Sequence, residues 1–160
     1  MSDPYHRTTF QGKRVDERTK SALEWVNRHF HKRTGKYITV VQGSYNAGPG
    51  AVSASAGTHD GGGVVDFSVI GLTIREQHIL HNLTRKAGFA SWIRPYIPRL
   101  WPRHIHAVLL GHKNASYGAK QQMASYLRHR NGLVGDAWDG SWRPKHNRVW
   151  SHRRKKPVRS

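Results

Sequence analysis

The segment GVVDFSVI, residues 63–70, places one acidic side chain in the middle of an otherwise apolar stretch. Its alternation with a period of two predicts a β-strand on which Asp66 shares one face with Val64 and Ser68. The other face carries only apolar side chains, namely Val65, Phe67 and Val69. Acidic side chains are rarely buried unless they are paired, because burying a lone charge is costly. Asp66 therefore needs a reason beyond packing to lie on this strand.

A histidine and three consecutive glycines precede the strand. His59 lies seven residues before Asp66, and the glycines at 61–63 stand between them. Glycine adopts backbone conformations that other residues avoid, so this segment can turn tightly and bring a loop histidine beside the carboxylate.

A second strand is predicted at HIHAVLL, residues 104–110, where alternation puts His104 and His106 on one face. The chain has no cysteine, so disulfides and thiolate metal sites are excluded, and a transition metal must be held by histidine and carboxylate. His59, Asp66 and His106 form a candidate zinc-binding set. The competing interpretation is that these histidines are surface residues, because twelve occur in this basic chain.

The remaining signals fit a single α+β domain, since 160 residues are too few for two full domains. Residues 16–34 are predicted to form a helix ended by Gly35, with Leu23, Val26 and Phe30 on one face. Other predicted elements are a helix from the capping box at Thr73 and Glu76 to Ala87, a helix at 115–130, strands at 36–45 and 89–93, and a loop at 46–57. We expect a small antiparallel sheet flanked by about three helices.

The two ends of the chain are polar and basic. Residues 1–15 are interpreted as a flexible arm or a loop on the substrate side, and residues 143–160 contain no acid and are interpreted as a solvated basic tail. The folded domain is then residues 1–142. The N-terminus lacks the apolar region of a secretory signal, and no segment suits a membrane span. We therefore expect synthesis in the cytosol without membrane insertion, so that an external substrate would be reached only if another factor lets the protein across.

Charge indicates the class of partner. Twenty-seven Lys and Arg against nine Asp and Glu give a net charge of +18. A charge of this size draws a protein to polyanions such as nucleic acids or anionic envelope polymers. Charge alone does not choose between them.

Three motifs resemble those of one enzyme family. SAGTHDGGGVVDFS, residues 55–68, resembles the S-x-G-x-H-x6-D segment of zinc D-Ala-D-Ala carboxypeptidases and hedgehog-like peptidases. RHIHAVL, 103–109, resembles their H-x-H segment, and QGSYN, 42–46, resembles the strand-end motif before their zinc loop. The likeness spans about residues 20–130, and GDAWDGSWRP near the C-terminus resembles versions in actinobacterial phages.

The resemblance implies a fold, a site and an activity. The fold would be the hedgehog/DD-peptidase type, with the zinc site carried on the small sheet. His59, Asp66 and His106 would be zinc ligands, while His104 would lie beside the metal without binding it and act in catalysis. The activity would be hydrolysis of a peptide bond in peptidoglycan by a phage endolysin, released to the cell wall with the help of a holin. Candidate substrate-binding residues near the motifs are Gln42, Ser44, Tyr45, Ser55, Thr58, Trp92 and Arg94.

One position departs from the family pattern. Many branches place a glutamate three residues before the last histidine ligand, and here Arg103 stands there. No glutamate follows Glu76, so a glutamate base from the last strand is excluded. This favours His104 as the base, with Asp60 as a weaker substitute.

Two other classes of function remain open. A nucleic-acid-binding protein would explain the charge and the scattered aromatic residues, but not the spacing of His59 and Asp66. A virion protein could keep the zinc ligands without activity. For an active enzyme, the bond that is cut remains open among D-Ala-D-Ala, a D-Ala to diaminopimelate cross-link and L-Ala to D-Glu.

Overall fold

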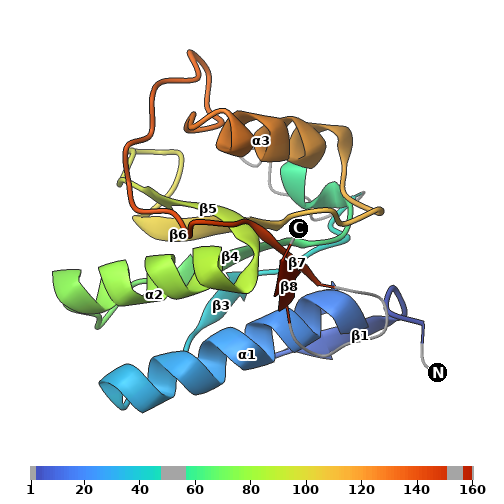
Figure 1. Ribbon diagram of the computed structural model, residues 1–160, viewed down its shortest axis with the longest axis horizontal. Helices are drawn as coiled ribbons and strands as arrows, with labels where there is room; N and C mark the ends of the chain where they lie inside the picture. The colour runs from blue at the N-terminus through green and yellow to red at the C-terminus, as the bar shows by residue number, and fades with distance from the viewer. Residues whose placement is uncertain (1–2, 48–56, 151–156, 160) are drawn as a thin grey trace.

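The computed structural model describes residues 3–47, 57–150 and 157–159 of the chain. Within these ranges the protein is a small single-domain α+β fold with three α-helices and antiparallel sheets, as the sequence predicts (Figure 1). The elements in chain order are β1 (Arg7–Phe10), β2 (Lys13–Asp16), α1 (Glu17–Thr34), β3 (Val40–Gln42), a 3-10 turn (Thr58–Asp60), β4 (Val64–Ser68), α2 (Ile74–Ala87), β5 (Phe89–Arg94), β6 (His104–Leu109), α3 (Tyr117–Leu127), β7 (Arg148–Trp150) and β8 (Pro157–Arg159).

A four-stranded antiparallel sheet in the order β3-β4-β6-β5 forms the middle layer. Helices α1 and α2 lie on one side of it and α3 lies on the other (Figure 1). The main core between the sheet and the helix pair includes Leu23, Phe30, Phe67, Leu80 and Leu109. A smaller core on the α3 side includes Val64, Trp92, Val108 and Tyr126. Since side chains alternate along a strand, the residues of β4 and β6 that do not enter the main core face α3.

The ends of the first two helices follow local rules. Asp16 caps α1, its side chain accepting a hydrogen bond from the backbone N–H of Thr19 at 2.9 Å, and Gly35 ends the helix with a φ of 75°. Thr73 and Glu76 make the predicted reciprocal capping box at the start of α2. The predictions for these two helices are confirmed.

The N-terminal segment differs from the expected arm, because β1 and β2 pair as a hairpin. Val15 on β2 is fully buried in the main core, which anchors the hairpin to α1. In the turn of the hairpin, Gln11 donates a hydrogen bond to the Ile38 carbonyl at 2.9 Å and accepts one from the Val40 N–H at 2.8 Å. The Gln11 side chain thus bonds to backbone groups at the start of β3, and the strand predicted at 36–45 is limited to Val40–Gln42.

Two later elements also differ from expectation. Helix α3 spans only Tyr117–Leu127, shorter than the predicted 115–130, because Ser116 caps its start and its last turn closes at Arg128. In the predicted basic tail, β7 and β8 pair with each other in antiparallel register. The tail therefore contains regular backbone structure in its described parts.

Among the helices of the described ranges, none has the length and apolar character needed to cross a lipid bilayer.

A buried histidine joins α2 to the sheet. His81 is 3% exposed, and its Nε2–H donates a hydrogen bond to the Ser91 carbonyl on β5 at 3.0 Å. Burial, with a contribution from the charge of Arg85, lowers the pKa of His81 from 6.5 to about 4. The ring is therefore neutral in the folded protein at pH values where it would be protonated in an unfolded chain.

His81 should make the protein less stable in mild acid. Because the unfolded chain binds the proton more readily, the free energy of unfolding falls as the pH drops from 6.5 toward 4. We expect His81→Gln, which keeps a donor for the Ser91 carbonyl, to remove about 2 kcal/mol of the loss between pH 7 and pH 5. Urea unfolding of both proteins at the two pH values measures this. Equal losses in the two proteins would contradict it.

Candidate metal centre

The register of the sheet aligns the candidate residues in two rows on the α3 side. In one row, Gln42, Asp66, His106 and Trp92 are neighbours across β3, β4, β6 and β5. In the next row, Ser68 is opposite His104, which is opposite Arg94. Strand pairing alone therefore gathers groups from four separate segments of the sequence.

His59 reaches these rows from the 3-10 turn before β4. The turn is held by the backbone, since the Asn46 N–H donates to the His59 carbonyl and the Tyr45 N–H to the Gly61 carbonyl, each at 2.9 Å. The His59 Nδ1–H donates to the Gly43 carbonyl at 2.8 Å, and Nε2 lies 3.3 Å from Asp66 Oδ1. The histidine and the carboxylate thus meet, as their spacing predicts.

The three glycines are needed for close packing as well as for turning. A Cβ at Gly62 would collide with the His112 ring and would lie 2.5 Å from the Tyr45 hydroxyl. A Cβ at Gly63, where φ is +81°, would lie 2.8 Å from the same ring, and one at Gly61 would collide with the Asn114 carbonyl. The backbone before β4 therefore rests directly on the segment after β6.

His112 belongs to a buried polar cluster centred on Asp16. The Asp16 carboxylate has no solvent exposure, and it accepts hydrogen bonds from His112 Nε2–H at 2.6 Å and from the Tyr45 hydroxyl at 2.7 Å. Burial alone would raise the pKa of Asp16, but the hydrogen bonds and the charge of His112 outweigh it and the pKa is lowered. Sequence reasoning did not single out Asp16 and His112, because nothing local marks two residues 96 positions apart as partners.

His59, Asp66 and His106 form a group that could hold a metal ion. All three are buried, and one ligand atom from each lies within 4.8 Å of the others. The nearest pair is His106 Nδ1 and Asp66 Oδ1, at 2.8 Å. Among the residues that the structure describes, this is the one such group of three or more ligand side chains.

In His59 and His106, the ring nitrogen that faces away from Asp66 is hydrogen-bonded in a way that suits metal binding. His59 uses Nδ1–H on Gly43, and His106 uses Nε2–H on the Gln122 side-chain oxygen at 2.8 Å, so each ring presents its other nitrogen to Asp66. Burial lowers the pKa of His106, which favours loss of a ring proton, so a cation could replace the proton between Nδ1 and Asp66 Oδ1. Metal-binding histidines are commonly oriented in this way by a partner on the second nitrogen.

Asp66 remains ionised despite burial. Burial would raise its pKa, but hydrogen bonds and charge from His106 and His59 hold the pKa far below the ordinary value of 3.8. A charged carboxylate is the form that binds a metal ion.

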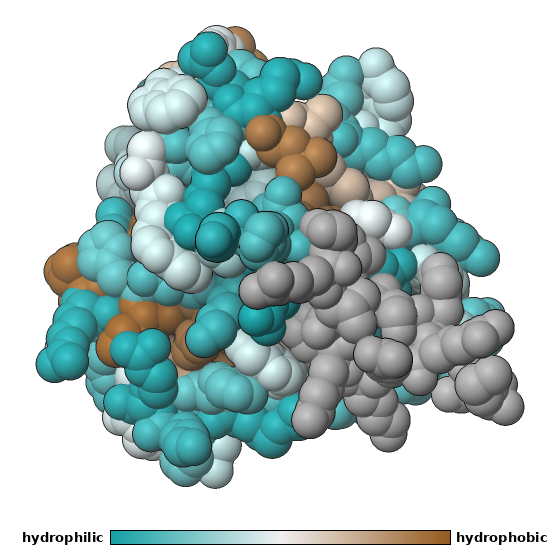
Figure 2. All heavy atoms as spheres, in the orientation of Figure 1, coloured by the Kyte–Doolittle hydropathy of each residue, from teal (hydrophilic) through white to brown (hydrophobic). Residues whose placement is uncertain are grey.

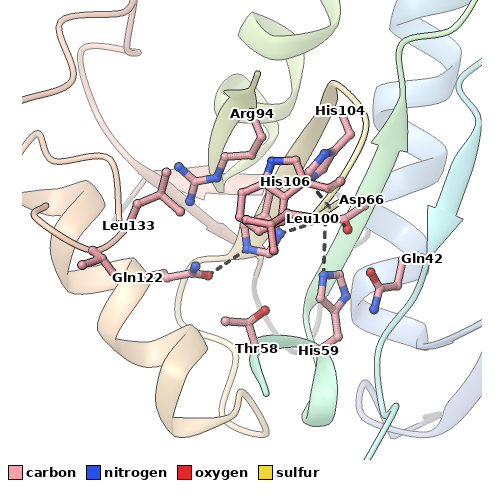
Figure 3. A pocket seen from close by; sticks show the side chains of 13 residues that line it. Gln42, Thr58, His59, Asp66, Arg94, Leu100, His104, His106, Gln122 and Leu133 are labelled. Atoms are coloured by element: carbon pink, nitrogen blue, oxygen red, sulfur yellow. Dashed lines mark hydrogen bonds and ion pairs between the residues drawn. The ribbon is translucent and has the colours of Figure 1, made fainter. Parts of the chain in front are cut away.

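The group opens into a cavity of about 290 Å³ (Figure 3). Apart from the three ligand side chains, the walls are formed by Gln42, Thr58, Arg94, Leu100, Trp101, His104, Gln122, Gly132, Leu133 and Val134. Arg94 is the one basic side chain of fixed charge among them, and burial lowers its pKa only to about 10. The cavity therefore combines a potential metal site with one fixed positive charge and an apolar rim.

His104 lies at the edge of the metal group. Its Nδ1–H donates to the Pro102 carbonyl at 2.7 Å, and its Nε2 is 3.9 Å from Asp66 Oδ2. The Trp101 ring meets it edge to face at a centroid distance of 5.9 Å. These contacts leave Nε2 directed into the cavity, which suits a group that exchanges protons with a ligand.

Neither Asp60, the substitute base, nor Arg103, which stands where many branches have a glutamate, reaches this position. Arg103 turns away and donates from Nε to the Gln77 side chain at 2.8 Å. Asp60 is exposed and does not line the cavity.

Of the seven candidate substrate-binding residues, three line the cavity, three lie elsewhere and one lies outside the described residues. Gln42, Thr58 and Arg94 line the cavity. Ser44 and Tyr45 are buried in structural contacts, Ser44 with the Val64 carbonyl at 2.8 Å and Tyr45 with Asp16. Trp92 lies behind His106, with the rings stacked at 6.3 Å and 17°. Ser55 lies outside the described residues.

Comparisons with known proteins leave the family open. No family model matches the chain, and neither a curated protein nor a solved structure matches it.

Gln122 should strengthen metal binding although it does not reach the metal position. Gln122→Ala removes the acceptor that orients His106, and loss of such a partner typically weakens metal affinity about 10–100-fold. Zinc titration in competition with a chromogenic chelator measures the effect. The matched control is Gln121→Ala on the exposed side of α3, which should leave affinity unchanged. Equal affinities for the two variants would contradict the role of Gln122.

Gly62 should be required for the position of His59. In Gly62→Ala the added methyl group must displace the His112 ring or the loop, and overpacking of this kind typically costs about 1–3 kcal/mol. We expect lower stability together with weaker zinc binding, measured by thermal unfolding and chelator competition. Gly140→Ala is the control, because its Cβ would meet only the indole ring of the exposed Trp138. An unchanged zinc affinity in Gly62→Ala would show that the loop does not depend on this contact.

Proposed function

We propose that this protein is a zinc-dependent peptidase that cleaves peptide bonds in bacterial peptidoglycan. The observation that carries the proposal is the buried group of His59, Asp66 and His106, with the outer nitrogen of each ring already hydrogen-bonded. Two imidazoles and one carboxylate, open on one side to a cavity, are typical of catalytic zinc sites. A thiolate site is excluded because the chain has no cysteine.

The chain's own residues supply the other parts of a hydrolytic mechanism. Zinc, when bound, provides Lewis-acid catalysis by activating water and polarising the peptide carbonyl. His104 Nε2 faces the cavity because Nδ1–H is held by Pro102, so the ring accepts a proton from the attacking water and returns it to the leaving amine. Thr58 and Gln42 lie on the cavity wall, where they offer polar groups to the substrate backbone.

The substrate class follows from the motif resemblance and from charge. The S-x-G-x-H-x6-D and H-x-H segments resemble those of enzymes that act on wall peptides, and the net charge of +18 would concentrate the protein on anionic wall polymers. Figure 2 shows one face on which hydrophilic side chains predominate. A phage endolysin acting at the cell wall is the role that unites these features.

A nucleic-acid-binding role is the second candidate, and the same charge favours it. It would give binding that weakens steeply with salt, and it would need no metal. A peptidase would need its metal even where salt screens the attraction to the wall.

Digestion of purified peptidoglycan tests the proposal. We expect the protein with one bound zinc to release fragments with new peptide termini, identified by mass spectrometry, and chelation to stop the reaction. His104→Ala should retain zinc but hydrolyse about 10²–10⁴-fold more slowly, since general acid–base groups contribute on that scale. His31→Ala, exposed on α1, is the control and should remain active.

Three results would count against the proposal. Failure to bind zinc after reconstitution would remove the metal site. A fully active His104→Ala would remove His104 from the mechanism. Absence of cleavage together with tight, salt-sensitive binding of DNA would favour the second candidate.

A further inference from the structure

Arg94 ends β5 beside the metal group, and its position is set by the sheet. It is opposite His104 in the strand register and lines the same cavity as His59, Asp66 and His106. Only 4% of the residue is exposed. In Figure 3 its guanidinium lies between His106 and Leu133.

The hydrogen bonds of Arg94 are incomplete. Nη1 donates to the Asn131 carbonyl at 2.6 Å, and the guanidinium carbon lies 4.8 Å from the centre of the Trp92 ring. Nη2 is buried and has no hydrogen-bond partner among the described residues. No carboxylate in the described ranges forms an ion pair with Arg94 at 4.0 Å or less, and nearby Asp66 is engaged by the histidines. A buried charged donor without a partner is unfavourable, so its retention suggests a ligand.

Comparison with Arg85 shows that this chain can satisfy a buried arginine fully. Arg85 is 1% exposed, and it donates to the Asp139 carboxylate at 2.7 Å and to the carbonyls of Ser91 and Trp142. Within the described ranges, the other buried side-chain atoms without partners belong to Arg18, Tyr126 and Arg143, none of which lines the metal cavity. Of the side chains that the structure describes, Arg94 alone combines a buried donor without a partner with a place in that cavity.

We infer that Arg94 binds a carboxylate of the substrate and thereby selects peptides that carry one close to the bond that is cut. The inference rests on the proposed function, since it concerns the substrate of the same site. A guanidinium recognises a carboxylate through paired N–H donors, and Nη2 supplies one that the protein leaves free. Because Arg94 is 4% exposed, an ion pair with it would be less screened by water than one on the protein surface.

The spacing of residues along the strands indicates how far the selected carboxylate lies from the bond that is cut. Arg94 is one row, or two residues, from His106, which corresponds to about 7 Å along the strands. An extended peptide advances about 3.5 Å per residue. The selected carboxylate therefore lies within about two residues of the carbonyl that is attacked.

Peptide binding to an inactive, zinc-loaded protein tests the inference without relying on turnover. The probe is a stem peptide of L-Ala, D-Glu, diaminopimelate, D-Ala and D-Ala, with free carboxylates or with every carboxylate converted to carboxamide. In the His104→Ala background, calorimetry should show that amidation weakens binding at least tenfold. Adding Arg94→Met should reduce that difference to less than twofold, whereas adding Arg75→Met, exposed on α2 across the sheet, should preserve it. The Arg75 control excludes a general effect of losing one positive charge.

A conservative variant covers the case in which Arg94→Met fails to fold or to bind zinc. Arg94→Lys keeps the charge but loses the paired donors, and it should weaken binding of the carboxylate peptide three- to tenfold without affecting the carboxamide. In the active protein, the same variant should raise KM more than it lowers kcat.

The outcomes separate this inference from the proposed function. Cleavage of the peptide with an amidation effect that persists in Arg94→Met would overturn the role of Arg94 and leave the peptidase proposal intact. Carboxylate-selective binding that depends on Arg94, without any cleavage, would support the ligand site and count against the peptidase. If the zinc-loaded protein binds neither peptide, the inference is wrong.

Discussion

The buried carboxylate of Asp16 connects the parts of the fold that surround the metal group. It caps α1 through Thr19 and accepts hydrogen bonds from Tyr45 after β3 and from His112 after β6. Because the glycines before β4 pack directly on the His112 ring, the same cluster sets the path of the loop that carries His59. A buried charge that loses a partner is strongly destabilising, so this cluster holds its members in one arrangement.

Asp16 and Asp66 are both buried, but the residues around them suit the two carboxylates to different roles. The hydrogen-bond donors of Asp16 come from all sides and leave the carboxylate without exposure, so it has no access to a ligand. Asp66 faces a cavity, and its two histidine partners also use their other nitrogens on Gly43 and Gln122. Both carboxyls have lowered pKa values, but only the surroundings of Asp66 resemble a metal site.

The two faces of the sheet carry different kinds of side chain, because side chains alternate along each strand. One face of β4 and β6 contributes Val65, Phe67 and Ile105 to the main core. The opposite face presents Asp66 and His106 in one row and His104 with Arg94 in the next, while His59 joins Asp66 and His106 from the 3-10 turn before β4. A rigid sheet suits such a site, because strand pairing sets the distances between the groups that the strands carry.

Local patterns in the sequence were enough to locate several elements and the central site residues. Asp16, Gly35, Thr73 and Glu76 act within a few positions of themselves, so the limits of α1 and α2 could be predicted. The period of two on β4 and β6 likewise indicated that Asp66 lies on the face opposite Val65, Phe67 and Val69 and that the two histidines of H-x-H share one face. Patterns of this kind depend on neighbours along the chain, which the sequence displays directly.

Contacts between distant segments were decided only by the tertiary structure. The sequence does not indicate that Gln11 bonds to the backbone at the start of β3, that Gln122 orients His106, or that Arg94 has a donor without a partner. The triple glycine was predicted to form a turn, yet its second requirement, room for the His112 ring, appears only when the two segments pack together. Asp16 and His112 are 96 residues apart, and nothing near either residue records the other. Their pairing is decided by how the helices and strands pack, because that packing alone brings the two side chains within hydrogen-bonding distance.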